Sequence, residues 1–187
     1  MKKLNRLMLL LCFVFVATGC EILGRTGDFE RNNTIPTTGL VMDSIQHEIA
    51  ENYNMKVING IVSDATTEKP IYKLMDILSE TDTEFFPSAK HFAIEGIIGG
   101  YILEPLDSTG SSELVIVIEM EDSTLTDEVY TAMQKVLSDQ FAYWNDRVFS
   151  QKELVRNNAI VTQGHFFLYV TSKQKDDIIT AFQEAVN

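Results

Sequence analysis

Histidine and serine side chains are the groups through which this sequence could carry out catalysis. The three histidines, His47, His91 and His165, are far apart in the chain and fit no metal-binding spacing such as HExxH. Serines are plentiful, but none lies in the GxSxG turn that presents the nucleophile of many hydrolases. We expect His47 on the polar side of a helix and His165 at the exposed end of a strand. The sequence therefore assigns no catalytic residue and no cofactor.

An acidic stretch, EMEDSTLTDE at residues 119–128, could instead bind a cation. Hard cations such as Ca²⁺ prefer oxygen ligands, and this stretch lacks the loop spacing and the central glycine of an EF-hand. We interpret it as a solvated strand end that leads into a negatively charged helix start. No metal ligand is assigned, and cation binding stays an open question for its five carboxylates, Glu119, Glu121, Asp122, Asp127 and Glu128.

The two cysteines, Cys12 and Cys20, both lie near the amino terminus. A basic start and an uncharged apolar run at residues 7–16 are typical of a removable signal peptide, and the run is too short to span a bilayer. The tetrapeptide at residues 17–20, ATGC, resembles a bacterial lipobox, so we expect Cys20 to become the lipidated first residue, carrying acyl chains such as palmitate. The alternative is a conventional secreted protein with a chance cysteine. If Cys12 is removed and Cys20 is acylated, no thiol remains for a disulfide or for catalysis.

These signals predict three parts: a signal peptide at 1–19, the lipidated cysteine with a flexible tether at 20–39, and one extracytoplasmic domain at 40–187. Removal of residues 1–19 leaves 12 basic residues against 27 acidic ones, a formal charge of −15. That balance argues against nucleic acid as a partner and against electrostatic adhesion to anionic lipid. We therefore expect membrane attachment through the lipid on Cys20 alone.

The domain begins with helical periodicity. Val41, Ile45, Ile49 and Tyr53 recur at the spacing of an amphipathic helix. Residues 57–62 fit a strand or a helix equally well. Residues 71–80 suggest a second short helix, because apolar side chains recur there at helical spacing, namely Ile71, Leu74, Met75 and Leu78.

From residue 96 onward the pattern predicts strand, strand, helix, strand, strand, helix. The run LVIVIEM at 114–120 is apolar on both faces, so this strand should be central or covered on both sides. Gly99 and Gly100 suggest a bulge or a close approach in the strand before it. Residues 126–144 form the clearest helix, whose closing aromatics, Phe141, Tyr143 and Trp144, we interpret as buried anchors rather than a ligand platform. The expected fold is α+β, with an antiparallel sheet of about four strands and helices on one face.

This carboxy-terminal pattern resembles a known family. The leader with its lipobox, the strand ELVIVIEMED, a helix ending in FAYW, then LVRNNAIVTQGHFFLYVTS and IITAFQEAV, resemble the bacterial lipoprotein family called domain of unknown function 4358. The resemblance is best over residues 93–186, and it implies a Gram-positive, mostly Firmicutes, source. The family has no established activity or substrate, so Cys20 is the one functional position that the resemblance carries over.

We expect a membrane-anchored module of the cell envelope that binds a protein partner or another envelope component without catalysis. The alternative is a hydrolase-type or cation-dependent envelope enzyme without a recognisable motif. Such an enzyme would need a polar pocket in which titratable side chains converge with shifted pKa values.

Overall fold

The computed structural model describes residues 35–53, 56–59, 71–79, 87–122 and 126–187. The expected signal peptide, Cys20 and most of the expected tether therefore lie outside the described residues. The part from Pro36 to Asn187 forms one compact unit. Within the described residues, no helix combines the length and the apolar character needed to cross a membrane.

A six-stranded sheet is the centre of this unit, with the order β1-β2-β3-β4-β6-β5. Strands β1 and β2 pair in parallel, and all other neighbours pair antiparallel. The strand bounds are β1 Lys56–Asn59, β2 Ile71–Asp76, β3 Ile97–Pro105, β4 Leu114–Met120, β5 Ala159–Gln163 and β6 Phe166–Thr171. The helices are α2 Thr38–Tyr53, the 3₁₀ helix η2 Ala89–Phe92, α3 Thr126–Trp144, α4 Phe149–Arg156 and α5 Lys175–Val186.

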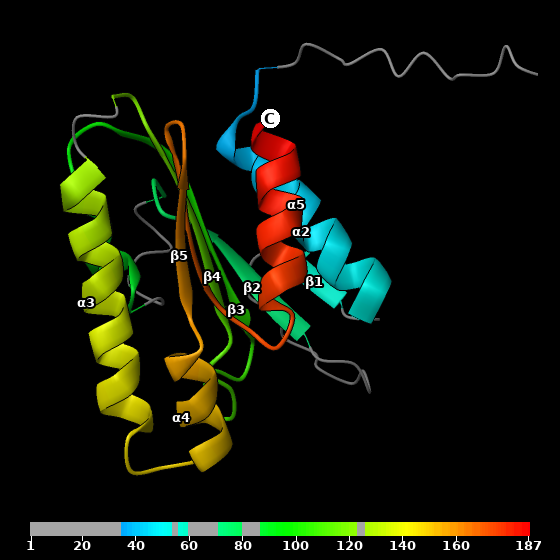
Figure 1. Cartoon of the computed structure of the whole chain (residues 1–187), viewed down its shortest axis with the longest axis vertical. Helices are drawn as coiled ribbons and strands as arrows, with labels where there is room; N and C mark the ends of the chain where they lie inside the picture. The colour runs from blue at the N-terminus through cyan, green and yellow to red at the C-terminus, as the bar shows by residue number, and fades with distance from the viewer. Residues whose placement is uncertain (1–34, 54–55, 60–70, 80–86, 123–125) are drawn as a thin grey trace, which may run out of the picture. The chain divides into compact units, whose positions relative to one another are not determined.

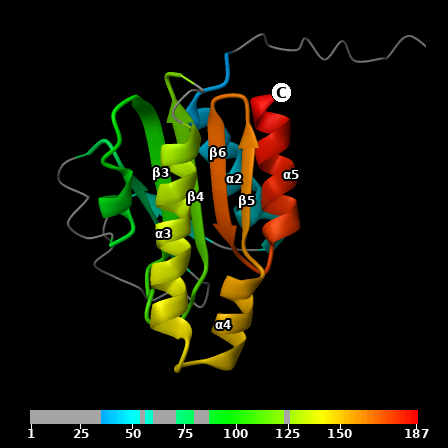
Figure 2. The ribbon, with the colours of Figure 1, turned by 60° about the vertical axis from the view of Figure 1, so that its left-hand side comes forward.

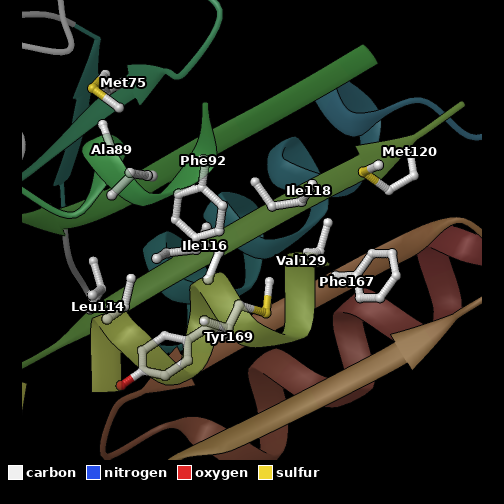
Figure 3. Packing of buried hydrophobic residues seen from close by; sticks show 14 residues of the cluster. Met75, Ala89, Phe92, Leu114, Ile116, Ile118, Met120, Val129, Phe167 and Tyr169 are labelled. Carbon is white, nitrogen blue, oxygen red and sulfur yellow. The ribbon is translucent and has the colours of Figure 1, made fainter. Parts of the chain in front are cut away.

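Helices cover both faces of the sheet. Successive side chains of β4 point to opposite faces, so its apolar residues contribute to two cores. Ile116 and Ile118 contribute to a core shared with η2 and α3, where Phe92 and Val129 pack (Figure 3). Val115 and Val117, between them, belong to a second core with α2 and α5. Figures 1 and 2 show α3 on one side of the sheet and the neighbouring helices α2 and α5 on the other.

The α+β class and the order of elements from β3 to α5 are confirmed, with the short helix α4 added between α3 and β5. The expectation that the strand at 114–120 is central or covered on both sides is also confirmed, since β4 lies inside the sheet and contributes to both cores. Two details were wrong, since the sheet has six strands rather than about four, and helices pack on both faces rather than one. The second difference arises because α5, together with α2, packs on the face opposite to α3.

The expected helix at residues 71–80 was also wrong. Ile71–Asp76 is strand β2, which lies between β1 and β3. Tyr72 packs in the core under α2 and α5, whereas Met75 packs in the core under α3. The apolar positions thus serve both faces of a strand, and pairing with two neighbours outweighs the helical spacing. Residues 57–59 of the undecided segment belong to β1, and residues 60–62 lie outside the described part of the chain.

The glycines of β3 explain how α2 approaches the sheet. The register between β3 and β4 shifts between Ile97 and Gly99, so the expected bulge is confirmed. A Cβ atom at Gly99 would lie 2.1 Å from Oγ1 of Thr38, the first residue of α2. Glycine is required here because the helix start occupies the space of a side chain.

Candidate functional site

The structure places the three histidines on three different elements. His47 is exposed on α2, and His165 is exposed in the turn before β6, both as predicted. His91 lies on η2, on the opposite side of the sheet from α2, where its Nε2 atom is 2.8 Å from Oδ2 of Asp139 on α3. Among the described residues, no three His, Cys, Asp or Glu side chains are placed to hold a metal ion.

The acidic stretch at residues 119–128 divides into two parts. Glu119 binds the start of α2, because its Oε2 atom accepts hydrogen bonds from Oγ1 and from the backbone N–H of Thr38, the latter at 2.8 Å. Glu121, Asp122, Asp127 and Glu128 are exposed at the end of β4 and in the first turn of α3. The role of Glu119 was missed from the sequence, since Thr38 lies 81 positions away.

A pocket of about 410 Å³ lies between the carboxyl-terminal half of α3, the start of η2 and the β3–β4 loop. This volume is in the range of small-molecule sites. We call it the α3 pocket. Its lining comprises Pro87, Ser88, Glu104, Ser108, Thr109, Ser111, Glu113, Leu114, Val136, Asp139, Gln140, Tyr143 and Trp144.

A hydrogen-bond network holds Gln140, one of the residues that line the α3 pocket, in place. Gln140 donates from Nε2 to the carbonyl oxygen of Ser112 at 3.0 Å. Its Oε1 atom accepts from Tyr169 at 2.7 Å and from Thr171 at 3.1 Å. Burial raises the pKa of Tyr169 to about 12, so this hydroxyl stays protonated as a donor at neutral pH. The network therefore ties α3 to β6 and to the start of β4, which makes this wall of the pocket rigid.

The carboxylates of the α3 pocket already have partners. Lys73 Nζ lies 2.7 Å from Oε1 of Glu104, directly across the β2–β3 pair. Asp139 faces His91 and Lys90, and the hydrogen bonds from these two side chains, His91 first, lower the pKa of Asp139. Glu113 accepts a hydrogen bond from the hydroxyl of Tyr72, whose pKa is raised by burial and by this carboxylate.

The aromatic residues at the end of α3 differ in their exposure to solvent. Trp144 is 3% exposed, so its interpretation as a buried anchor is confirmed. Tyr143 is 38% exposed, and its ring meets that of Trp144 edge-on at 4.9 Å. The guanidinium carbon of Arg147 lies 3.9 Å from the centre of the Tyr143 ring, a cation–π contact. A stacking platform is therefore disfavoured, because one ring is buried and a guanidinium covers a face of the other.

Two further hollows are less suited to a ligand. One, beside η2 and the first turns of α3, is lined by side chains of mixed charge that include Lys90, Asp127 and Lys135. The other surrounds the contact between Thr38 and Glu119, where the polar groups are already bonded to each other. The α3 pocket is the better candidate because its lining combines apolar side chains with several hydroxyl and carboxylate groups.

Glu104 and Gln140 were missed as site residues from the sequence. A charged residue at the end of the apolar run GGYILEP was a signal that could have drawn attention to Glu104. Gln140 lies on the apolar stripe of α3, where a polar side chain needs partners when it is buried. Which partners each one meets depends on segments that are distant in the sequence.

Residues 95–172 match the family model described as Domain of unknown function (DUF4358). The resemblance noted in the sequence is thus confirmed over these residues. The matched part includes most of the α3 pocket, whereas α2, β1, β2, η2 and α5 lie outside it. No curated protein and no solved structure matches the chain at a significant level.

Proposed function

We propose, taking this family match as the premise, that the chain is a lipid-anchored extracytoplasmic binding module of the cell envelope. In this proposal Cys20 carries the lipid, residues 20–39 form the tether, and the α3 pocket holds the ligand. The anchor rests on the basic start, apolar run and lipobox of the first 20 residues. An anchor with more than one acyl chain holds a protein firmly, whereas a single chain does not.

The observation that carries the binding role is the pairing of the pocket's titratable groups. Glu104 pairs with Lys73, Asp139 contacts Lys90 and His91, and Glu113 accepts a hydrogen bond from Tyr72. A general base requires a pKa near the working pH and free access to a substrate proton. The lowered pKa of Asp139 and the raised pKa of Tyr72 both move away from that range. These groups are therefore better suited to holding a ligand than to transferring protons.

The position of the α3 pocket also supports a binding role. The carboxyl-terminal end of α3 and the neighbouring helix α4 lie at the end of the domain opposite to the start of α2 (Figures 1 and 2). In an anchored protein, the tether at residues 20–39 leads into α2. The pocket would then open away from the point of attachment, toward other envelope components.

Fractionation tests the anchor. Cys20→Ala should release the protein from the membrane fraction or leave its signal peptide uncleaved. A processed product that stays bound to the membrane would refute lipidation of Cys20. Cys12→Ala is the matched control, because this residue is expected to be removed with the signal and should change neither processing nor location.

Crosslinking in intact cells tests the binding role. A photoreactive amino acid at Ser108, on the rim of the α3 pocket, should give a defined adduct, and the same group at Thr180, exposed on α5, should not. Identical adducts from both positions, or none from Ser108, would contradict the assignment of this pocket.

The enzyme alternative has one feature in its favour, the pair formed by Asp139, which lines the α3 pocket, and His91, which lines the hollow beside η2. A histidine oriented by a carboxylate is half of a nucleophile-activating arrangement. Turnover of a generic ester by the wild-type protein, lost in His91→Gln, would favour this alternative over the binding module. Equal rates for both proteins would count against it.

A further inference from the structure

Strand β5 forms one edge of the sheet, and this edge is open. Figure 1 shows β5 at the front of the domain, between α3 and α5, with no helix or strand across it. Within the described residues, no backbone hydrogen bond joins β5 to a segment other than β6. Hydrogen bonds alternate along an antiparallel pair, so every second residue of β5 turns its N–H and C=O groups away from β6. These groups can pair with a further strand.

The turn between β5 and β6 identifies the outward-facing residues. It has two residues, and Gln163 pairs with Phe166 across it. The hydrogen bonds of such a closing pair lie within the hairpin. By alternation along the strand, Ile160 and Thr162 present their backbone N–H and C=O groups to the open edge.

Strand β5 lacks the features that commonly protect an edge strand from pairing. Its sequence, AIVTQ, contains no proline and no charged residue, and its register with β6 runs without a bulge. Apolar side chains also reach the edge on both faces of the sheet. Ile160 packs against the core under α3, Ala159 and Val161 pack against the core under α2 and α5, and all three are partly exposed. A further strand at this edge would therefore extend both cores.

The distribution of charge favours a second copy of the chain as the source of that strand. The chain carries 27 acidic and 15 basic residues, so two copies repel each other through their net charge. The hairpin at residues 157–172, NNAIVTQGHFFLYVTS, contains no Asp, Glu, Lys or Arg. Two β5 strands can therefore meet without like charges on either strand. Antiparallel pairing of β5 with itself is also self-complementary, as a twofold-symmetric dimer requires.

We propose that β5 pairs antiparallel with β5 of a second copy and joins the two six-stranded sheets into one continuous sheet. Pairing centred on Val161 places Ile160 of one copy opposite Thr162 of the other, so the outward-facing residues exchange hydrogen bonds. The twofold axis is perpendicular to the sheet, so both copies can be anchored in a membrane that lies parallel to the sheet. This inference goes beyond the proposed function, because the pairing needs no ligand in the α3 pocket.

Disulfide crosslinking in intact cells tests the pairing. Val161→Cys places one thiol at the twofold centre, where the Cα atoms of directly opposite residues lie about 4.5 Å apart, within the range of a disulfide. A mild oxidant should convert this variant to a linked dimer with twice the monomer mass on a non-reducing gel. The wild type should stay monomeric, as should Ser138→Cys, whose thiol is exposed on α3.

Two substitutions at Thr162 test whether the strand edges make the contact. Thr162→Pro removes an outward-facing N–H group and leaves the hydrogen bonds to β6, so in the Val161→Cys chain it should reduce crosslinking by about fivefold or more. Urea unfolding shows whether the proline variant is folded. Thr162→Lys tests the contact without proline, because it brings the lysines of the two copies to about 7–8 Å from each other and should also reduce crosslinking. Ser138→Lys adds the same charge on α3 and should leave crosslinking unchanged.

No linked dimer from Val161→Cys, or an equal yield from Ser138→Cys, would overturn the pairing. Linkage of Val161→Cys to a protein of another mass would overturn the second copy as the partner and would indicate a different strand donor. Unchanged crosslinking in both Thr162 variants would overturn the contact between strand edges. The membrane location of Cys20→Ala and the crosslink from Ser108 are measured separately, so failure of the pairing is distinguishable from failure of the proposed function.

Discussion

The contact between the start of α2 and the sheet leads to a sharp prediction for Gly99→Ala. The new Cβ atom would lie 2.1 Å from Oγ1 of Thr38 and 3.0 Å from its Cβ. Thr38 is buried, and both its N–H and its hydroxyl group donate to Glu119. The side chain therefore cannot move aside without losing a hydrogen bond to a carboxylate.

The magnitude follows from two contributions. Overpacking of a well-packed site costs about 1–3 kcal/mol. Loss of a hydrogen bond to a charged group costs about 1.5–3 kcal/mol. Since relaxation of the first turn of α2 reduces both, we expect the free energy of unfolding to fall by about 3 kcal/mol.

Urea unfolding of the full chain, followed by the fluorescence of Trp144, measures this change. Gly110→Ala is the matched control, because the nearest atom to its new Cβ is Oδ2 of Asp107 at an ordinary 3.5 Å. This variant should stay within about 0.5 kcal/mol of the wild type. Thr38→Ala removes the hydroxyl that Gly99→Ala meets, so the double variant should lose at least about 1 kcal/mol less than the sum of the two single losses. Additive losses, or a Gly99→Ala variant as stable as Gly110→Ala, would refute the reasoning.

Three further predictions follow from the pKa shifts and the layers. Asp139 has a lowered pKa in the folded state, so it stabilises the fold above its unfolded pKa and this contribution is lost as the pH falls below about 4. The stability difference between wild type and Asp139→Asn should shrink over that range, and a constant difference would contradict the ion pairing. Tyr169 has a pKa raised to about 12, so its contribution is complete below pH ~10 and is lost as the pH rises toward 12. Ultraviolet titration should show one late-ionising tyrosine fewer in Tyr169→Phe than in the wild type, where the pKa of Tyr72 is raised as well, and identical curves would contradict the burial of Tyr169. A fragment of residues 95–172 lacks α2 and α5, so it should bind a hydrophobic dye and show no cooperative unfolding, unlike residues 36–187. A cooperatively folded, dye-free fragment would show that these helices are dispensable.

Much of the fold could be predicted because it depends on local patterns. The run LVIVIEM has apolar residues on both faces, which predicted a central, covered strand, and α3 shows a long helical stripe. Strand β2 could not be predicted in this way, since its apolar residues fit a helix and pairing with β1 and β3 decides its state. The distribution of helices over both faces was missed, because nothing local shows that α5 packs with α2 on the face opposite to α3.

The candidate site depends almost entirely on distant contacts. Glu104 pairs with Lys73 across two strands, and Gln140 on α3 binds groups on β6 and before β4. None of these partners follows from periodicity, since hydrogen bonds between distant side chains leave no regular spacing in a sequence. The expected lipidation of Cys20, in contrast, depends on adjacent residues alone, because signal and lipobox form a continuous segment of sequence, and it stays a prediction.

The side-by-side packing of α2 and α5 also has a consequence for the timing of folding (Figure 1). The first and last described helices of the domain together cover one face of the sheet, so this layer is completed only when the last residues of the domain have left the ribosome. Until Ile178 and Phe182 have emerged, Leu168 and Val170 lack much of the apolar surface that buries them. If the chain is exported as its leader predicts, it can reach the translocation machinery before its fold is able to close, in the unfolded form that passage through a narrow channel requires.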